Sequence, residues 1–129
     1  MPLKIQKLDH FAIYVSDLPR AESFYSELLG MKVHNRIGEE QVLLRCGDAL
    51  LALFAKPDLK TPVEPDAHVD PFGRAHFAVE ISAEDWKTAL QEFNDLGTPT
   101  SRPIDWGDHD CFYITDPDGN LIELMSRKD

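Results

Sequence analysis

The sequence predicts an α+β fold made of two strand-helix-strand-strand-strand (βαβββ) modules. One observation is a phrase that occurs twice, as His10–Ser16 (HFAIYVS) and as His76–Ser82 (HFAVEIS). A second phrase also returns, as Leu50–Lys56 (LLALFAK) and as Leu121–Arg127 (LIELMSR). The third observation is that, in both halves, an amphipathic helical stretch and then short alternating segments lie between the two phrases. Such self-similarity is typical of two related structural modules.

The first module covers about residues 3–56. Residues Ile5–Val15 alternate between an apolar and a mixed face, which predicts a strand. Asp17 is a candidate helix cap, and Gly30 is a candidate helix end. The apolar stripe expected on this helix consists of Ala21, Phe24, Leu28 and Leu29. Three short strands are expected after it, near Lys32–Ile37, Gln41–Arg45 and Ala49–Phe54.

The second module covers about residues 74–127 and follows a proline-rich segment, residues 57–73, that we expect to be a linker. Its helix is expected over about residues 83–96, with Trp86, Leu90 and Phe93 on the buried stripe. Strands are expected at Ala75–Ile81, near Thr100, and at Asp110–Thr115 and Asn120–Met125. The turn Asp116–Asn120 contains Pro and Gly where a hairpin requires fixed and positive φ angles.

Composition limits the class of function. A chain of 129 residues is long enough for one domain, residues 1–129, in which both modules share a core. The net charge of −10 argues against binding to nucleic acid or to an anionic membrane surface, because both require clustered Lys and Arg. The two cysteines, Cys46 and Cys111, form no CxxC motif, and no apolar stretch is long enough for a signal peptide or a membrane span. We therefore expect a cytoplasmic protein.

Three residues at matching places in the repeat suggest a metal site. His10 and His76 open equivalent strands, and Glu123 occupies the place that Ala52 has in the first module. Strand alternation places all three on the faces opposite the apolar residues that the helices would cover. Two imidazoles and one carboxylate form the facial triad of metal enzymes. Taken singly, each residue is more often an ordinary strand or surface residue, but the repeat favours the metal interpretation.

The closing run Phe112–Glu123 (FYITDPDGNLIE), the N-terminal Leu-Asp-His phrase and the paired modules resemble the vicinal oxygen chelate superfamily. This superfamily includes glyoxalase I, extradiol dioxygenases, fosfomycin-resistance proteins and bleomycin-binding proteins. The resemblance implies that the two modules form one cupped mixed sheet with the helices on its outer face, and that the protein is a homodimer. It also implies a divalent metal ion in the cup, bound by His10, His76 and Glu123.

This chain differs from several branches of the superfamily at residues important for their function, and these differences disfavour the activities of those branches. Glyoxalase I has a fourth ligand, a glutamate, at the place of Ala52, so ordinary glyoxalase I activity is disfavoured. Fosfomycin-resistance enzymes have a threonine at the place of Ala12 and cationic residues where Pro103 and Trp106 stand, although Arg102 could partly compensate. Bleomycin-binding members generally lack the metal triad that this chain retains.

The resulting hypothesis is a metal-dependent enzyme, similar to an extradiol dioxygenase or a lyase, that binds a small oxygenated substrate through two oxygens. The metal could be Fe, Mn, Ni, Co or Zn, since all accept these donors. Tyr113 is expected to face the same side as Glu123, and both are candidate catalytic residues. Whether His109 or Glu80 takes part stays open, and ordinary roles are favoured for both. The alternative is a small-molecule-binding or antibiotic-resistance protein of the fosfomycin or bleomycin type.

Overall fold

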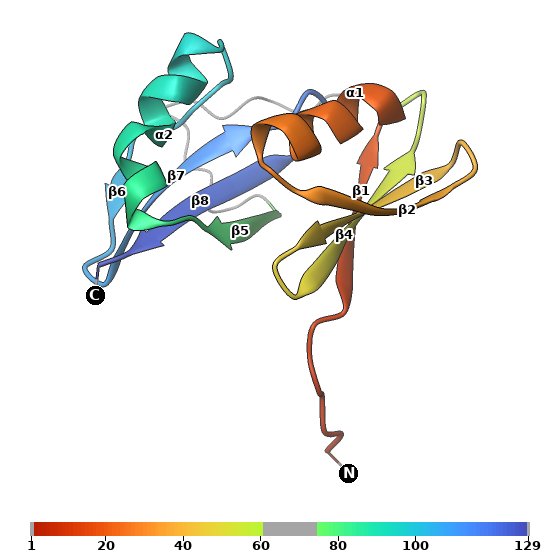
Figure 1. Ribbon diagram of the computed structural model, residues 1–129, viewed down its shortest axis with the longest axis horizontal. Helices are drawn as coiled ribbons and strands as arrows, with labels where there is room; N and C mark the ends of the chain where they lie inside the picture. Colours follow the sequence, from red (N-terminus) through yellow and green to blue (C-terminus); the bar gives the residue numbers. More distant parts are fainter. Residues whose placement is uncertain (1, 61–74, 129) are drawn as a thin grey trace. The chain divides into compact units, whose positions relative to one another are not determined.

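The computed structural model describes residues 2–60 and 75–128 of the chain (Figure 1). The chain divides after Lys60 into two compact units, and each unit has the order strand, helix, strand, strand, strand. The prediction of an α+β fold with two βαβββ modules is therefore confirmed. Residues 61–74, which form most of the expected linker and include His68, lie outside the described residues.

The first unit contains one four-stranded mixed sheet in the order β1-β4-β3-β2. β1 and β4 are parallel, and the other neighbours are antiparallel. Its elements are β1 (His10–Val15), α1 (Leu18–Ser23), a π-helical turn η1 (Phe24–Leu28), β2 (Lys32–Ile37), β3 (Gln41–Cys46) and β4 (Ala49–Ala55).

The first strand is shorter than the alternation predicted. It begins at His10 rather than at Ile5, because β4 begins at Ala49 and the parallel register starts with the pair His10↔Leu50. In Figure 1 the N-terminal segment runs away from the sheet of this unit. Alternation therefore predicted the facing of the side chains correctly but could not show where the neighbouring strand ends.

The first helix begins as expected and continues differently. The Asp17 carboxylate accepts a hydrogen bond from the backbone N–H of Arg20 at 3.0 Å, which is the predicted N-cap. The π-helical turn then places Tyr25 in the core, where it is fully buried, whereas Phe24 and Leu28 of the predicted stripe are only half-buried. The wider turn shifts the apolar stripe, and an expectation based on a period of about 3.6 residues misses that shift.

The second unit repeats the topology with its sheet in the order β5-β8-β7-β6. Its elements are β5 (His76–Glu80), α2 (Ala83–Asp95), β6 (Ile104–Asp105), β7 (His109–Thr115) and β8 (Leu121–Arg127). The parallel pair β5 and β8 starts with His76↔Leu121, which matches His10↔Leu50 in the first unit. The internal repeat seen in the sequence is thus also a repeat of strand register.

The helix of the second unit packs on one face of its sheet. Ser82 caps α2 by accepting a hydrogen bond from the backbone N–H of Asp85. Trp86 and Phe93 contact the fully buried ring of Phe112, with ring centroids 5.4 and 6.2 Å apart. Because strand side chains alternate, the neighbours of Phe112 on β7 point to the opposite face, and that face carries the candidate site.

The hairpin between β7 and β8 is fixed by a buried aspartate. The Asp116 carboxylate accepts hydrogen bonds from the backbone N–H groups of Asp118 and Asn120 and from the Asn120 amide, at 2.8–2.9 Å. Gly119 has a φ of +83°, which the turn requires. This turn sets the register in which Tyr113 pairs with Glu123.

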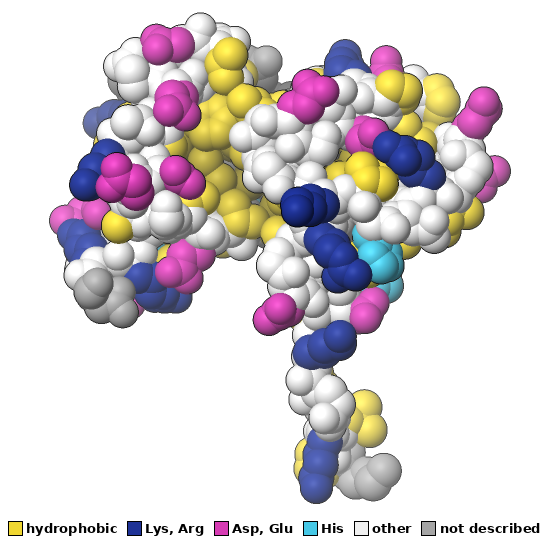
Figure 2. Space-filling model, in the orientation of Figure 1, with side chains coloured by type: hydrophobic (Ala, Val, Ile, Leu, Met, Phe, Trp, Pro, Cys, Tyr) yellow, Lys and Arg dark blue, Asp and Glu magenta, His cyan; other side chains and the backbone are white. Residues whose placement is uncertain are grey.

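Acidic side chains are scattered among Lys and Arg over the face drawn in Figure 2. None of the helices in the described part of the chain is long and apolar enough to cross a membrane.

Candidate metal centre

His76 and Glu123 lie side by side on the face of the second sheet that is opposite α2. His76 is on β5 and Glu123 is on β8, whose register places Glu123 two pairs beyond His76↔Leu121 and therefore on the same face as Leu121. The Nε2 atom of His76 is 3.3 Å from Oε1 of Glu123. The two side chains are 25% and 12% exposed, so the pair is accessible to a ligand without being fully solvated.

Tyr113 completes this group from β7. Its hydroxyl donates a hydrogen bond to Oε1 of Glu123 at 3.1 Å, and its ring meets the His76 ring edge-on at a centroid distance of 5.2 Å. The side chain is 2% exposed. The prediction that Tyr113 and Glu123 share a face is confirmed.

The donor atoms of His76 and Glu123 are spaced as two ligands of one metal ion would be. Donors about 2.1 Å from an ion and about 90° apart lie about 3 Å from each other. The observed separation of 3.3 Å is close to this value. Imidazole nitrogen and carboxylate oxygen are also the donor types that divalent first-row metals accept. This pair therefore fits a metal ion.

His10 belongs to the first unit. Its side chain is 54% exposed, and its Nδ1 atom lies 2.8 Å from the carboxylate of Asp9. The hydrogen bond from His10 lowers the pKa of the Asp9 carboxyl. An imidazole held through Nδ1 can present Nε2 to a metal. Among residues 2–60 and 75–128, no group of three His, Cys, Asp or Glu is close enough to hold a metal, so the three-residue ligand set stays a prediction.

Ala52 occupies the place in the first unit that Glu123 has in the second. The register pairs Ala12 with Ala52 on parallel strands, as it pairs Ala78 with Glu123. Ala52 is fully buried. The sequence alignment of the two modules is therefore correct at this position, and the first module supplies no carboxylate there.

The sequence analysis missed two residues that support the centre. Ser101 accepts a hydrogen bond from the backbone N–H of Tyr113 at 2.8 Å and thus fixes this part of β7. Cys111 is fully buried next to Tyr113 and Glu123. Burial raises the pKa of its thiol to about 11, an N–H from Trp106 opposes the shift, and the Glu123 carboxylate adds to it. The period of two along β7 places Cys111 on the same face as Tyr113, and this signal could have identified it.

The sequence left open whether His109 and Glu80 take part in a reaction. His109 opens β7 with its Nδ1 atom 2.7 Å from the Asp108 carboxylate, and its ring stacks on Trp106. Glu80 is exposed at the end of β5.

Comparison with known proteins places the chain in a family. Residues 7–124 match the model of the Glyoxalase/Bleomycin resistance protein/Dioxygenase superfamily. The chain belongs to this superfamily. The match spans both modules, and the resemblance that the closing run suggested is confirmed.

Individual relatives are similar over most of their length. The glutathione transferase FosA of Serratia marcescens is 30% identical over 93% of this chain and 80% of its own. The metallothiol transferase FosB of Staphylococcus epidermidis is 29% identical over 95% of this chain and 82% of its own. The fosfomycin resistance protein FosX of Listeria monocytogenes shares the fold, with a TM-score of 0.76 at 18% identity over 97% of this chain and 96% of its own.

Proposed function

We propose that this member of the superfamily is a metal-dependent enzyme that binds a small substrate through two neighbouring oxygens to a divalent ion. His10, His76 and Glu123 are the proposed protein ligands. The observation that carries the proposal is the pair His76 Nε2 and Glu123 Oε1 at 3.3 Å, with the Tyr113 hydroxyl on the same carboxylate oxygen. An ion with three protein ligands keeps positions for a bidentate substrate.

Each residue of the centre has a distinct role in this proposal. A bound ion would supply Lewis-acid chemistry, by polarising the substrate oxygens. Glu123 balances its charge, and Tyr113 orients the carboxylate and can donate its proton to a substrate oxygen nearby. Ala78, the partner of Glu123 on β5, leaves room beside the ligands.

The finer reaction that we propose is oxidative ring cleavage, as in extradiol dioxygenases, or a lyase step through an enolate-like species. The ion could be Fe, Mn, Ni, Co or Zn. Glyoxalase I activity is disfavoured, because the fourth ligand of that branch is replaced by the buried Ala52.

A second candidate is thiol transfer to an antibiotic such as fosfomycin. The similarity to the glutathione transferase FosA and the metallothiol transferase FosB favours it. The sequence favours it less, because Ala12 stands where that branch has a threonine and Trp106 stands in its cationic region.

One set of assays separates these functions. Protein purified without chelator would be analysed for metal and then reloaded with each candidate ion. Dioxygen uptake with catechols, hemithioacetal isomerisation and glutathione transfer to fosfomycin would then be measured. For ring cleavage we expect metal-dependent dioxygen uptake with catechols, and for either proposed reaction a loss of turnover of about 100-fold or more in Glu123→Gln. Turnover that persists in EDTA, or that is equal in Glu123→Gln, would rule the metal enzyme out.

A further inference from the structure

Trp106 is a half-exposed indole on a tightly bonded turn before β7. Trp106 is 50% exposed. The backbone N–H of Trp106 donates to the carbonyl of His109 at 2.9 Å, and the N–H of Gly107 donates to the Asp105 carboxylate at 2.8 Å. Gly107 has a φ of +95°, which only glycine adopts readily. The turn therefore has a fixed backbone.

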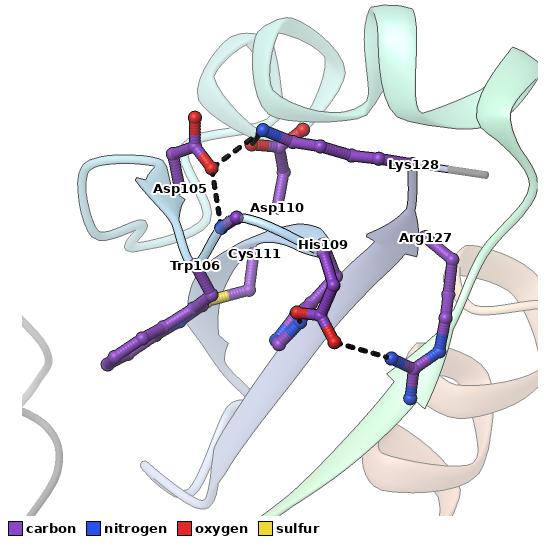
Figure 3. Close-up of polar contacts among 9 residues, drawn as sticks. Asp105, Trp106, His109, Asp110, Cys111, Arg127 and Lys128 are labelled. Atoms are coloured by element: carbon purple, nitrogen blue, oxygen red, sulfur yellow. Dashed lines mark hydrogen bonds and ion pairs between the residues drawn. The ribbon is translucent and has the colours of Figure 1, made fainter.

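The indole ring itself is also fixed. Its Nε1–H donates to Sγ of Cys111 at 3.3 Å, and its plane stacks on His109 at a centroid distance of 6.5 Å and an angle of 21°. His109 is held in turn by the Asp108 carboxylate. Figure 3 shows the Trp106 ring beside the Cys111 sulfur. A large exposed aromatic that is already ordered loses little entropy when it binds a ligand, so it is preorganised for binding.

Cys111 connects Trp106 to the candidate metal centre. It shares one face of β7 with Tyr113, and its thiol interacts with both the Trp106 N–H and the Glu123 carboxylate. Cys111 and Tyr113 belong to a buried apolar cluster with Leu121, and the partly buried Ile104 and Met125 pack against this cluster. The half-exposed indole thus adjoins, through Cys111, the cluster whose Tyr113 contacts both His76 and Glu123.

The charges around the turn disfavour an anionic group at this place. Lys128 contacts the carboxylates of Asp105 and Asp110 at 2.6 and 3.6 Å. Arg127 contacts Asp108 at 3.6 Å. Both cations therefore face carboxylates, and three carboxylates stand against two cations (Figure 3). An uncharged planar group suits this surface better than a phosphonate does.

We propose that Trp106, backed by His109, determines substrate specificity by stacking on an uncharged planar ring whose oxygens are directed to His76 and Glu123. The inference rests on the proposed metal site and names the substrate class that the site accepts. Substrates with a ring next to their chelating oxygens bind more tightly than aliphatic substrates with the same oxygens.

Two chelators that differ only in the ring test this inference. Benzohydroxamate and acetohydroxamate present the same two oxygens to a metal. Their dissociation constants would be measured by calorimetry on Mn²⁺-loaded protein. We expect benzohydroxamate to bind about tenfold more tightly to the wild type. Trp106→Ala and Trp106→Leu should both remove this preference, whereas Trp106→Phe should retain most of it.

Trp86→Phe is the matched control, because Trp86 packs on Phe112 on the other face of the sheet. This variant should keep the preference for benzohydroxamate. Trp106 is then the one remaining tryptophan of the two in the chain, so benzohydroxamate should quench the tryptophan fluorescence. If folded Trp106→Leu bound both chelators in a metal-dependent way, with an unchanged ratio of their dissociation constants, the role of Trp106 would be overturned. The metal site would not be affected by that result. Binding of both chelators that does not depend on metal would overturn the metal site as well.

Discussion

Glu123 contacts two other side chains of the candidate centre. Its Oε1 atom is 3.3 Å from His76 Nε2 and 3.1 Å from the Tyr113 hydroxyl. A carboxylate in a partly buried position is costly unless such partners stabilise its charge. Three strands thus contribute one side chain each to this group, and an ion between His76 and Glu123 would find its donors already oriented.

Ala52→Glu tests the equivalence of the two modules at a single residue. The new carboxylate would stand where Glu123 stands in the second module, at a position that is now fully buried. Without metal it should destabilise the protein by about 2 kcal/mol or more. With a divalent ion it should act as a fourth ligand, raise the affinity for the ion and depress the native turnover.

Calorimetric metal titration and thermal melts with and without metal measure both effects. Ala52→Gln is the control, since it adds the same volume without the charge and should gain much less affinity. Unchanged metal affinity and unchanged turnover in Ala52→Glu would show that residue 52 does not face the ion. The argument against glyoxalase I activity would then be withdrawn.

The sequence predicted which side chains of the second module share a face because strands have a period of two. His76, Tyr113 and Glu123 share a face in the structure for that reason. The contact of Trp106 with Cys111 could not be predicted, because it depends on a turn with a positive φ at Gly107. Turn geometry of this kind leaves no periodic pattern in a sequence.

At the scale of elements, an ion pair connects the first helix to the edge strand of its sheet. The Arg36 guanidinium on β2 donates two hydrogen bonds, at 2.9 and 2.8 Å, to the two carboxylate oxygens of Glu22 on α1. These bonds lower the pKa of the Glu22 carboxyl below its ordinary value, while partial burial opposes the shift. The Glu22 side chain is 24% exposed and Arg36 is 59% exposed, so solvent screens the pair.

Glu22→Gln should therefore cost stability in a pH-dependent way. A carboxyl with a lowered pKa in the folded state stabilises the fold above its unfolded pKa, and the contribution is lost as the pH falls through the folded pKa. We expect a loss of about 0.5–1 kcal/mol near neutral pH and almost none at about pH 3. Urea unfolding of wild type and variant across this range measures the difference.

Asp58→Asn is the control for this experiment. Asp58 is 84% exposed and lies 3.5 Å from Lys56, so its removal should change the unfolding free energy little at any pH. A Glu22→Gln effect that stays constant down to about pH 3 would contradict the proposed role of the ion pair.

The bounds of the elements were predicted less well than their existence. Both helix caps have local sequence signatures. Asp17 was predicted as a cap, and Ser82 directly precedes the predicted start of the second helix. The π-helical turn η1 and the late start of β1 depend on packing and on the length of β4. Neither has a signature in the local sequence, since propensity and periodicity describe one segment at a time.

At the scale of the whole molecule, the two units repeat both the order of their elements and the register of their parallel strands. Each unit places one histidine at the start of the first strand of its sheet, and the second unit alone has the glutamate. We propose that both modules contribute ligands to one ion within a single domain. The homodimer implied by the family resemblance stays a prediction that light scattering would test.

The role of His10 decides this proposal, because His76 and Glu123 already lie together in one unit. The most direct measurement is calorimetric titration of metal-free protein with Mn²⁺, for the wild type and for three variants: His10→Ala, His76→Ala and Glu123→Gln. His34→Ala, which removes an exposed histidine on β2, is the control. We predict one ion per chain, a loss of affinity of about 100-fold or more in each of the three variants, and wild-type affinity in the control. Wild-type affinity in His10→Ala would contradict a metal centre shared by the two modules.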